Sequence, residues 1–523
     1  MFSATQLSSL WLVHNIALVV FSVLFTCLLI RAIYNLFLSP LCAIPGPWYY
    51  AVSDFWLTTH VLRLHQCKTI HDLFETYGPV VRVGPNKVVF CDISTSRNVY
   101  SVHKFDKSTY YKSVITNDND HAMTTLDHES HAIRRKSYAP HYTHASVSKF
   151  QPEINEYTFA TINTLEGLSG KTPVECLALF RHLMADVMVS SSFGYRLGAV
   201  GKWAMDVEDP LSTAIGDFPK RGILRSAVPT WAWDLVCRIP NNRWRQMCDS
   251  DKILAEFVST RVYEMRAQIN AGKCGDSEKP SLLQRLMRFQ YSPTQPMPDH
   301  DIISEAIGHM MAGTDTSSIT ISYLLWELSR RPDIMKKLQA ELDEAMTDCK
   351  TLPDVTILHQ LPYLSAFMKE GLRLYGAAPS LLERVVPAST SKNGGSDEIF
   401  DLMGYALPPG TVVATQAWSM HRDPTVFPSP ETFLPERWLE SSTSSEALAT
   451  MSTYMMPFGA GSRVCGGQNL AQLMLKSGIA ALVRNFDIVA PAETTERSME
   501  IKDSFVIFPS SMECKLLFVP RQV

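Results

Sequence analysis

One stretch near the C-terminal end constrains this chain more than any other. Residues 457–467 read Pro-Phe-Gly-Ala-Gly-Ser-Arg-Val-Cys-Gly-Gly, so Cys465 is flanked by four glycines. Glycine has no Cβ, so this backbone can bend sharply and a large flat partner can approach it closely. A helical pattern begins at Gln468. We therefore expect Cys465 at a helix start, where free N–H groups and the helix dipole stabilise a thiolate.

Several kinds of site compete for this stretch. A buried, inert thiol is the default for a lone cysteine. A dinucleotide loop would need a third glycine where Val464 stands. A phosphate loop would need Lys and Ser/Thr where Gly467 and Gln468 follow the last glycine. Zinc is disfavoured because no C-x-x-C pair or nearby His completes a tetrahedral set. A thiolate held under a flat ligand is, by contrast, one way to bind haem iron.

The stretch matches the pattern F-x-x-G-x-R-x-C-x-G through Phe458, Gly461, Arg463, Cys465 and Gly467. This pattern resembles the haem-binding signature of the cytochrome P-450 superfamily. The resemblance implies a haem b cofactor whose iron takes the Cys465 thiolate as axial ligand. It also implies that Arg463 pairs with a haem propionate and that Phe458 and Gly459 belong to the haem-binding loop. One departure is Met474, since many members carry Glu nine residues after the cysteine.

The composition fits one large globular enzyme. The chain has 523 residues, of which 46% are apolar and 19% charged, enough to bury a large core. Lys plus Arg (48) nearly balance Asp plus Glu (52), so nucleic acid is not expected as a partner. The eleven cysteines are scattered and odd in number. This argues against a disulfide scaffold and for a reducing environment that faces the cytosol.

The N-terminal segment predicts a membrane anchor. Residues 10–30 are almost wholly apolar apart from His14 and Asn15, and a span needs about 20 such residues. A cleaved signal peptide is the alternative, but no basic residue precedes the run and no A-x-A-like site ends it. Because Arg31 follows the run, the positive-inside rule places the rest of the chain in the cytosol. We expect an anchor over residues 1–31, a stiff proline-rich hinge over 32–47 and a catalytic domain over 48–523.

The body of the chain predicts a mainly α fold with a smaller β region. Valine-rich runs on either side of a Gly-Pro-Asn turn indicate β structure between residues 79 and 92, and helical patterns dominate to about residue 390. The basic patch at residues 131–136 is, taken alone, a solvated helix face. By resemblance, His131 takes an aromatic position and Arg135, four residues later, binds a propionate; the patch also suits an acidic redox partner. The family places a mobile substrate lid at about residues 190–244.

Residues 301–331 predict one long apolar helix that contains Ala-Gly-Thr-Asp-Thr-Ser at 312–317. Glycine there costs about 1 kcal/mol against alanine, and a buried Asp is costly without a partner or a task. A packing kink is the plain alternative. The hexad resembles the family's A-G-x-D/E-T-T/S element. The resemblance implies that Ala312 and Gly313 leave room for dioxygen, that Thr316 donates a hydrogen bond to it, and that Asp315 passes protons.

Two further motifs follow in the family's order. Glu370 and Arg373 lie three residues apart in a helix expected to end at Gly376, a usual C′ residue. Alone they would be an ordinary surface ion pair worth about 0.5 kcal/mol. By resemblance they form a structural triad with Arg437, which lies in a Pro-Glu-Arg-Trp segment, and serve the fold and haem insertion. Arg384 is, by resemblance, a second propionate partner.

The resemblance covers nearly everything after residue 45 and is closest to fungal members of secondary metabolism. It implies a monooxygenase on the endoplasmic reticulum membrane that inserts one oxygen atom from O2 into a lipophilic small molecule, by hydroxylation or epoxidation, in terpenoid, polyketide or alkaloid biosynthesis. Since no flavin or NADPH motif is present, an NADPH-cytochrome reductase would supply the electrons, with cytochrome b5 as a second donor. The alternatives are a haem-thiolate isomerase or dehydratase without O2, and a haem-binding protein without turnover.

Overall fold

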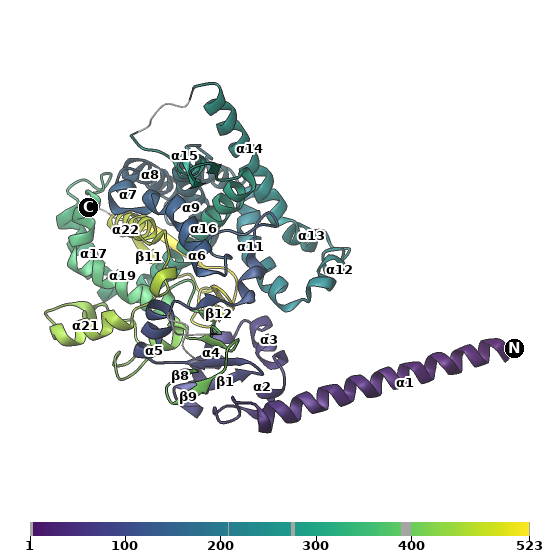
Figure 1. The fold of residues 1–523 in the computed structure, drawn as a ribbon. Helices are drawn as coiled ribbons and strands as arrows, with labels where there is room; N and C mark the ends of the chain where they lie inside the picture. The colour runs from purple at the N-terminus through teal and green to yellow at the C-terminus, as the bar shows by residue number, and fades with distance from the viewer. Residues whose placement is uncertain (1–3, 208, 274–277, 389–398, 522–523) are drawn as a thin grey trace.

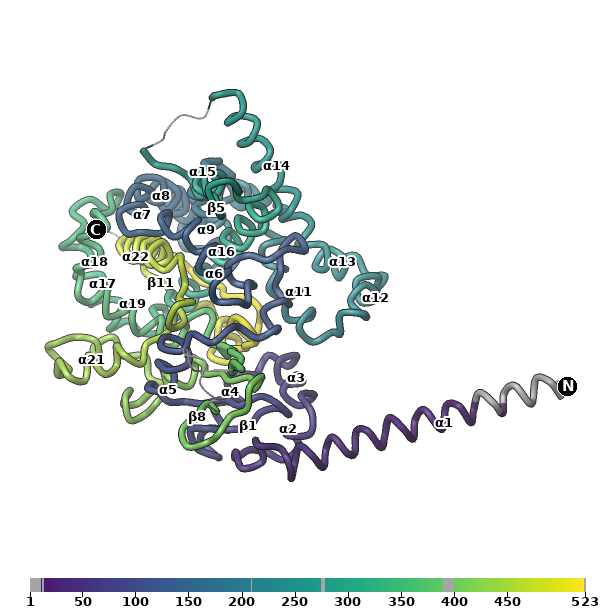
Figure 2. Tube along the Cα trace, in the orientation of Figure 1, coloured from purple at the N-terminus to yellow at the C-terminus, as the bar shows by residue number. Residues whose placement is uncertain are grey.

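The computed structural model describes residues 4–207, 209–273, 278–388 and 399–521. Most of this chain is helical, and the main β-sheet lies beside the base of a long N-terminal helix that projects away from the body (Figure 1). The N-terminus lies at the free end of this helix, while the C-terminus lies on the opposite side of the body (Figure 2). The expectation of a mainly α fold with a smaller β region is confirmed.

The projecting helix is α1 (Ala4–Ile33), which continues as one π-helical turn (Tyr34–Leu38). The stretch His14–Leu38 is long and apolar enough to cross a membrane, and its most apolar window is not buried by the rest of the protein, although Asn35 near its end is buried. The segment that we expect to be an anchor is therefore helical, and the expected boundary at residue 31 falls inside the helical run. Helix α9 (Cys176–Phe193) is also apolar enough, yet 78% of it is buried, so it is a core helix.

The connector after α1 is packed against the body. Its residues Leu41 and Ile44 are buried and belong to an apolar cluster that includes residues of the main β-sheet. The guanidinium of Arg82 donates a 2.8 Å hydrogen bond to the Asn35 carbonyl, and its backbone N–H donates one of 2.8 Å to the Pro45 carbonyl. Because the side chain of Arg82 is buried, these bonds tie the end of the anchor helix to a strand.

The main sheet has the strand order β1-β2-β10-β7-β3. Strands β1 and β2 form an antiparallel hairpin within the predicted β region, with Val81 opposite Val89. Both faces of the hairpin pack into apolar clusters, which explains its nearly continuous run of valines. The strands are β1 (Val80–Gly84), β2 (Lys87–Phe90), β10 (Val412–Ala414), β7 (Arg384–Val385) and β3 (Asp106–Lys107).

Four smaller sheets complete the β structure described. Strand β14 lies between β11 and β4, and the others are two-stranded hairpins, β12-β13, β5-β6 and β8-β9. Their bounds are β4 (Val174–Glu175), β5 (Gln290–Ser292), β6 (Gln295–Pro296), β8 (Phe400–Leu402), β9 (Tyr405–Leu407), β11 (Phe486–Val489), β12 (Ile501–Asp503), β13 (Ile507–Pro509) and β14 (Lys515–Pro520).

Helix α16 (Asp299–Ser329) runs through the main apolar core. The predicted long helix is thus present, displaced by two residues at each end. It is covered by α9, α11 (Pro210–Ala227), α14 (Ser250–Asn270), α19 (Pro362–Tyr375) and α22 (Gln468–Asn485). The remaining α-helices are α2 (Trp48–Val52), α3 (Phe55–Leu62), α4 (Gln66–Tyr77), α5 (Ile93–Arg97), α6 (His128–Tyr138), α7 (His144–Ser148), α8 (Gln151–Gly167), α10 (Ala199–Ala204), α12 (Trp233–Cys237), α13 (Asn242–Cys248), α15 (Leu282–Arg288), α17 (Pro332–Ala345), α18 (Val355–Gln360), α20 (Ala417–Met420) and α21 (Ser445–Tyr454).

One expectation about a helix end is wrong. Helix α19 ends at Tyr375 as predicted, but Gly376 has φ −56° and is not left-handed. A Cβ on Gly376 would lie 2.7 Å from the Leu372 carbonyl oxygen and 3.5 Å from the Pro457 side chain. The glycine is therefore required because a Cβ would clash with the Leu372 carbonyl oxygen, and not because the helix needs a left-handed cap; the Pro457 contact is of ordinary van der Waals length.

Candidate active site

The cysteine lies on a tight loop between α21 and α22. The Cys465 N–H donates a 2.8 Å hydrogen bond to the Phe458 carbonyl, which closes the loop. Gly459 (φ 79°) and Gly461 (φ 67°) adopt left-handed conformations. A Cβ on Gly461 would lie 2.1 Å from the Tyr100 carbonyl oxygen, whereas one on Gly459 would meet nothing within 4 Å. Glycine is thus needed at 461 by the fold, and at 459 the loop borders open space.

The Cys465 side chain is accessible although it lies deep in the protein. Its surface is exposed, yet desolvation by the surrounding protein raises the pKa of the thiol. The Gly467 N–H and the charge of Arg135 lower that pKa by less. Cys465 lies just before the Gly467 N-cap of α22, and in the protein alone burial outweighs the amide groups, so the thiolate stays a prediction for the protein with its metal bound. A bound metal ion would deprotonate a thiol in this position outright.

Helix α16 keeps one narrow stripe accessible while the rest of its middle is buried. In chain order the accessible residues are alternately one and three positions apart, so they share one face of the helix. Ala312 is exposed on this face, although the residues on either side of the stripe belong to the core. The five residues of the stripe are Gly308, His309, Ala312, Gly313 and Thr316.

Gly313 and Thr316 differ in detail from what the motif implied. A Cβ on Gly313 would lie 2.3 Å from the Met188 sulfur of α9, so this glycine serves the close packing of two helices. The Thr316 hydroxyl donates a 2.6 Å hydrogen bond to the Ala312 carbonyl, one turn earlier. The hydroxyl proton is therefore already used in this hydrogen bond, whereas the hydroxyl oxygen can still accept a hydrogen bond.

Asp315 is buried and faces α9 instead of the accessible stripe. Its Oδ1 lies 3.4 Å from both Nε and Nη2 of Arg181, and its Oδ2 has no hydrogen-bond partner among the described residues. Burial raises the pKa of Asp315, and the charges of Arg181 and Lys220 partly oppose that rise. Arg181 was not expected from the sequence, because no motif relates it to a residue 134 positions away.

The Arg181–Asp315 contact makes a pH-dependent prediction. When folding raises the pKa of a carboxyl group, the unfolded chain releases that proton at a lower pH than the folded protein does. The free energy of unfolding therefore falls as the pH rises from the unfolded-state pKa to the folded-state pKa. Arg181→Ala removes the opposing charge and raises the Asp315 pKa further. We expect Arg181→Ala to cost about 2 kcal/mol at pH 8 and much less at pH 5, measured by urea unfolding. The Asp315→Asn background should abolish this difference, and an equal loss at both pH values would contradict the assignment.

Three cations gather beside the loop. The register of β3 and β7 pairs Lys107 with Arg384, and Arg463 precedes Cys465. Burial, and then the charge of Arg384, lower the pKa of Arg463 to about 10. Burial, and then Arg384 and Arg463, lower the pKa of Lys107. Such mutual repulsion between buried cations indicates a place for an anion.

The hydrogen bonds that these cations already make leave donor capacity for that anion. Arg463 donates to the carbonyls of residues 125, 126 and 127 at 2.7–2.8 Å, and its Nε has no partner among the described residues. Lys107 donates a 2.6 Å bond to the Met123 carbonyl. Arg384 lies over the Tyr100 ring at 4.9 Å. Sequence reasoning missed Lys107, because only the β3–β7 register brings it beside Arg384.

Arg135 holds the cysteine loop from the other side. Its Nη1 donates hydrogen bonds of 2.9 Å to the Val464 carbonyl and 3.4 Å to the Ser462 carbonyl. His131 is buried one turn earlier on α6, and burial, followed by the charge of Arg463, lowers its pKa to about 3. A hollow of about 360 Å³ opens here, lined by His128, His131, Ala132, Arg135, Lys136, Ala139 and Ser462.

The three residues of the expected structural triad are in contact and buried. Arg373 bonds both oxygens of Glu370, at 2.9 and 2.8 Å, and Arg437 bonds Oε1 at 3.0 Å. The Trp438 indole N–H donates a further 2.9 Å bond to Oε2, a contact that Phe in this position would lack. Since the side chains of Glu370 and Arg373 are 0% exposed, the alternative of a surface ion pair is wrong.

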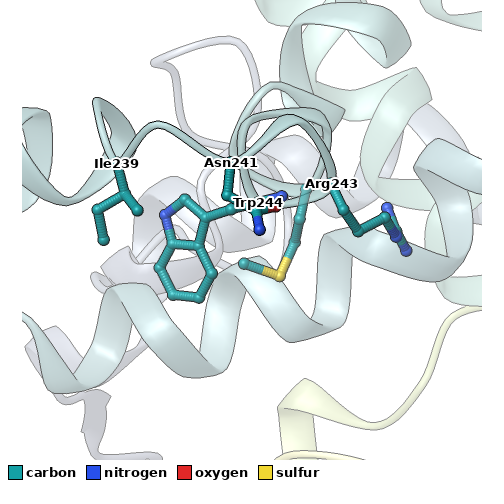
Figure 3. Close-up of a pocket in the computed structure, with 5 residues that line it drawn as sticks. Ile239, Asn241, Arg243 and Trp244 are labelled. Atoms are coloured by element: carbon teal, nitrogen blue, oxygen red, sulfur yellow. Dashed lines mark hydrogen bonds between the residues drawn. The ribbon is translucent and has the colours of Figure 1, made fainter.

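The predicted lid zone contains α10 to α13 and a second hollow. This hollow, of about 480 Å³, is lined by Ile239, Asn241, Arg243, Trp244 and Met247. Figure 3 shows Ile239 and Trp244 side by side, whereas Arg243 points away from them toward an ion pair with Asp217. In Figure 1 the α12–α13 hairpin lies at the edge of the body, away from α22. This hollow is therefore separate from the cysteine loop.

The described residues fit a bound haem. An accessible thiol lies on a glycine loop that borders open space, a helix keeps one accessible stripe, and buried cations leave a guanidinium nitrogen without a partner. These features suit an iron-bound thiolate, a flat macrocycle and its carboxylates. The described residues hold no cluster of three or more His, Cys, Asp and Glu that could bind a metal ion directly.

Comparisons with known proteins agree with this site. The Cytochrome P450 family model matches residues 44–516. The cytochrome P450 monooxygenase penB of Penicillium thymicola is 30% identical over 442 residues, which cover 83% of this chain and 95% of that protein. The cytochrome P450 monooxygenase cypX of Dothistroma septosporum is 28% identical over 505 residues, 93% of each chain. The N-acetyltryptophan 6-hydroxylase ivoC of Emericella nidulans is 28% identical over 497 residues, 92% of each chain. The chain therefore belongs to the cytochrome P450 family and is a haem-thiolate monooxygenase.

Proposed function

We propose that Cys465 is the axial ligand of haem b and that the buried cations hold the two haem carboxylates. The observation that carries this proposal is the accessible Cys465 thiol in an otherwise enclosed place. Arg463, Arg384 and Lys107 would each donate to a carboxylate, and Arg135 would fix the loop backbone beside the ligand. Bound through a thiolate, haem iron activates dioxygen and pushes electron density toward O–O cleavage.

The chain's own residues then supply protons and exclude water. Asp315 would pass protons to the site from the Arg181 side of α16. The Thr316 hydroxyl would donate next to the accessible stripe once its hydrogen bond to the Ala312 carbonyl is released. Ala312 leaves the centre of that stripe open. The apolar residues of α16 and α9 on either side keep bulk water away.

The same proposal extends to location and partners. Helix α1 anchors the protein in the endoplasmic reticulum membrane as a single span, with residues 1–31 as the anchor, 32–47 as the hinge and 48–523 in the cytosol. An NADPH-cytochrome reductase, with cytochrome b5 as a second donor, supplies electrons at the basic hollow around Arg135 and Lys136.

The substrate is a lipophilic intermediate of fungal secondary metabolism, a terpenoid, polyketide or alkaloid. Among the relatives compared, the name of ivoC gives a substrate, N-acetyltryptophan, which supports hydroxylation of a small organic molecule. The test is turnover of a substrate panel by purified protein with reductase and NADPH under ¹⁸O2. We expect a product that carries one labelled oxygen atom. A product formed without O2 would identify an isomerase or dehydratase instead, and the metabolite that accumulates when the gene is deleted would identify the substrate.

A further inference from the structure

His421 lies directly after α20 and is 2% exposed. Its Nδ1 is 3.0 Å from the Arg373 carbonyl oxygen, and its Nε2 lies 2.8 Å from the Met456 backbone nitrogen. Its own carbonyl accepts a 2.9 Å hydrogen bond from Nη1 of Arg373. This one side chain therefore touches both the structural triad and the segment that leads into the cysteine loop.

These partners settle how the imidazole is protonated. The Arg373 carbonyl can only accept, so Nδ1 carries the hydrogen; the Met456 N–H can only donate, so Nε2 must accept. Burial lowers the pKa of His421 to about 3; the Arg373 carbonyl opposes this, while the charges of Arg422 and Arg373 add to it. A neutral ring with this tautomer is thus the form that satisfies both neighbours, since a second ring N–H would face the N–H of Met456.

Met456 stands where the cysteine loop begins. Two residues later, the Phe458 carbonyl accepts the hydrogen bond from the Cys465 N–H. Between them, Pro457 packs against Gly376 at the end of α19, where an added Cβ would lie 3.5 Å from its side chain. The start of the loop is therefore attached to the α19 region at two points. Pro457 makes a van der Waals contact with Gly376, and the Met456 N–H donates a directional hydrogen bond to His421, which in turn bonds the Arg373 carbonyl.

We propose that His421 is a positioning residue that transmits the fixed geometry of the Glu370–Arg373 pair to the cysteine loop through the amide of Met456. It does not touch Cys465. It fixes the height and angle at which the loop leaves α21, and so the direction in which the thiol points. The inference rests on the proposed role of Cys465 as the haem ligand.

Two substitutions test the hydrogen bonds of the two ring nitrogens separately. The side-chain amide introduced by His421→Asn can replace Nδ1 as donor to the Arg373 carbonyl, but it is too short to accept from Met456 as well. His421→Gln places an amide oxygen near the former Nε2 and can accept from Met456. His421→Leu removes both hydrogen bonds. If the Leu variant does not fold, the comparison of the Asn variant with the Gln variant decides the question alone.

Two readouts test the proposal in the full-length holoprotein. The first is the rate at which the reduced carbonyl complex loses its red-shifted Soret band, which reports thiolate coordination. The second is hydrogen exchange of the Met456 amide. We expect both to rise about tenfold in His421→Asn and to stay near wild type in His421→Gln, because only the former leaves a buried N–H without an acceptor. Exchange of the α19 amides should be equal in the two variants.

The proposal is overturned if the Asn and Gln variants behave alike in both readouts, or if exchange rises equally throughout α19, which would indicate general destabilisation. Failure of the ligand assignment would look different. In that case wild-type protein itself would lack the red-shifted band, while the exchange of the Met456 amide would still distinguish the two variants.

Discussion

Glu370→Gln is expected to lower the free energy of unfolding by about 3–5 kcal/mol, which removes much of the stability of a typical domain. The carboxylate accepts from Arg373, Arg437, the Trp438 indole and the Leu434 backbone N–H, all at 2.8–3.0 Å. Gln keeps the shape but removes the charge that compensates two buried guanidinium groups. Their burial is then uncompensated, and breaking a buried pair in this way costs far more than losing a surface one.

The neighbouring Glu436 provides the control for this prediction. It pairs with Lys337 at 2.7 Å and with the Tyr363 hydroxyl at 2.9 Å, but it lies nearer the surface. We expect Glu436→Gln to cost less than about 1 kcal/mol. Urea unfolding followed by circular dichroism measures both, and haem content per folded chain should fall in Glu370→Gln alone. A Glu370→Gln protein as stable as Glu436→Gln would contradict the role assigned to the triad.

The second large effect is expected at two neighbouring residues of α16, the buried Asp315 and the accessible Thr316. Asp315→Asn and Thr316→Val should each lower product formation per NADPH consumed by about 100-fold, the range in which a positioned acid or base contributes. Electrons should then leave as hydrogen peroxide, because dioxygen is still reduced while protons no longer arrive in order. Product and peroxide, measured together with NADPH consumption, give the ratio directly.

Thr314 is the matched control for Thr316. Its hydroxyl makes the same bond to a carbonyl one turn earlier, 2.8 Å to Met310, but the side chain is buried away from the accessible stripe. Thr314→Val should therefore keep the wild-type ratio of product to NADPH. If Thr316→Val kept that ratio as well, proton delivery through Thr316 would be wrong.

Local sequence patterns could predict the parts of this protein that depend on neighbouring residues. The glycines around Cys465, the valine runs of β1 and β2 and the polar hexad inside α16 each follow from backbone conformation, periodicity or the cost of burial. The ends of α19 and α16 were predicted within two residues for the same reason. The reason for Gly376 was not, because the residue does not adopt the left-handed cap that the sequence suggests, and a Cβ there would instead meet the Leu372 carbonyl oxygen.

The missed residues depend on distant partners. Lys107 reaches Arg384 only through the pairing of two short strands. Arg181 meets Asp315 only because α9 packs along α16, at a point where Gly313 allows it. His421 gains its role from carbonyl and amide groups of Arg373 and Met456, which any residue types could present. Nothing in the local sequence around these three side chains reveals such partners.

The central claim is that the sulfur of Cys465 coordinates haem iron. The most direct measurement is the absorption spectrum of the purified, haem-loaded protein reduced under carbon monoxide, recorded beside Cys465→Ser. We predict a strongly red-shifted Soret band in the wild type and none in the variant, even when the variant retains haem. A folded, haem-loaded wild type without that band, or a variant that keeps it, would contradict the account.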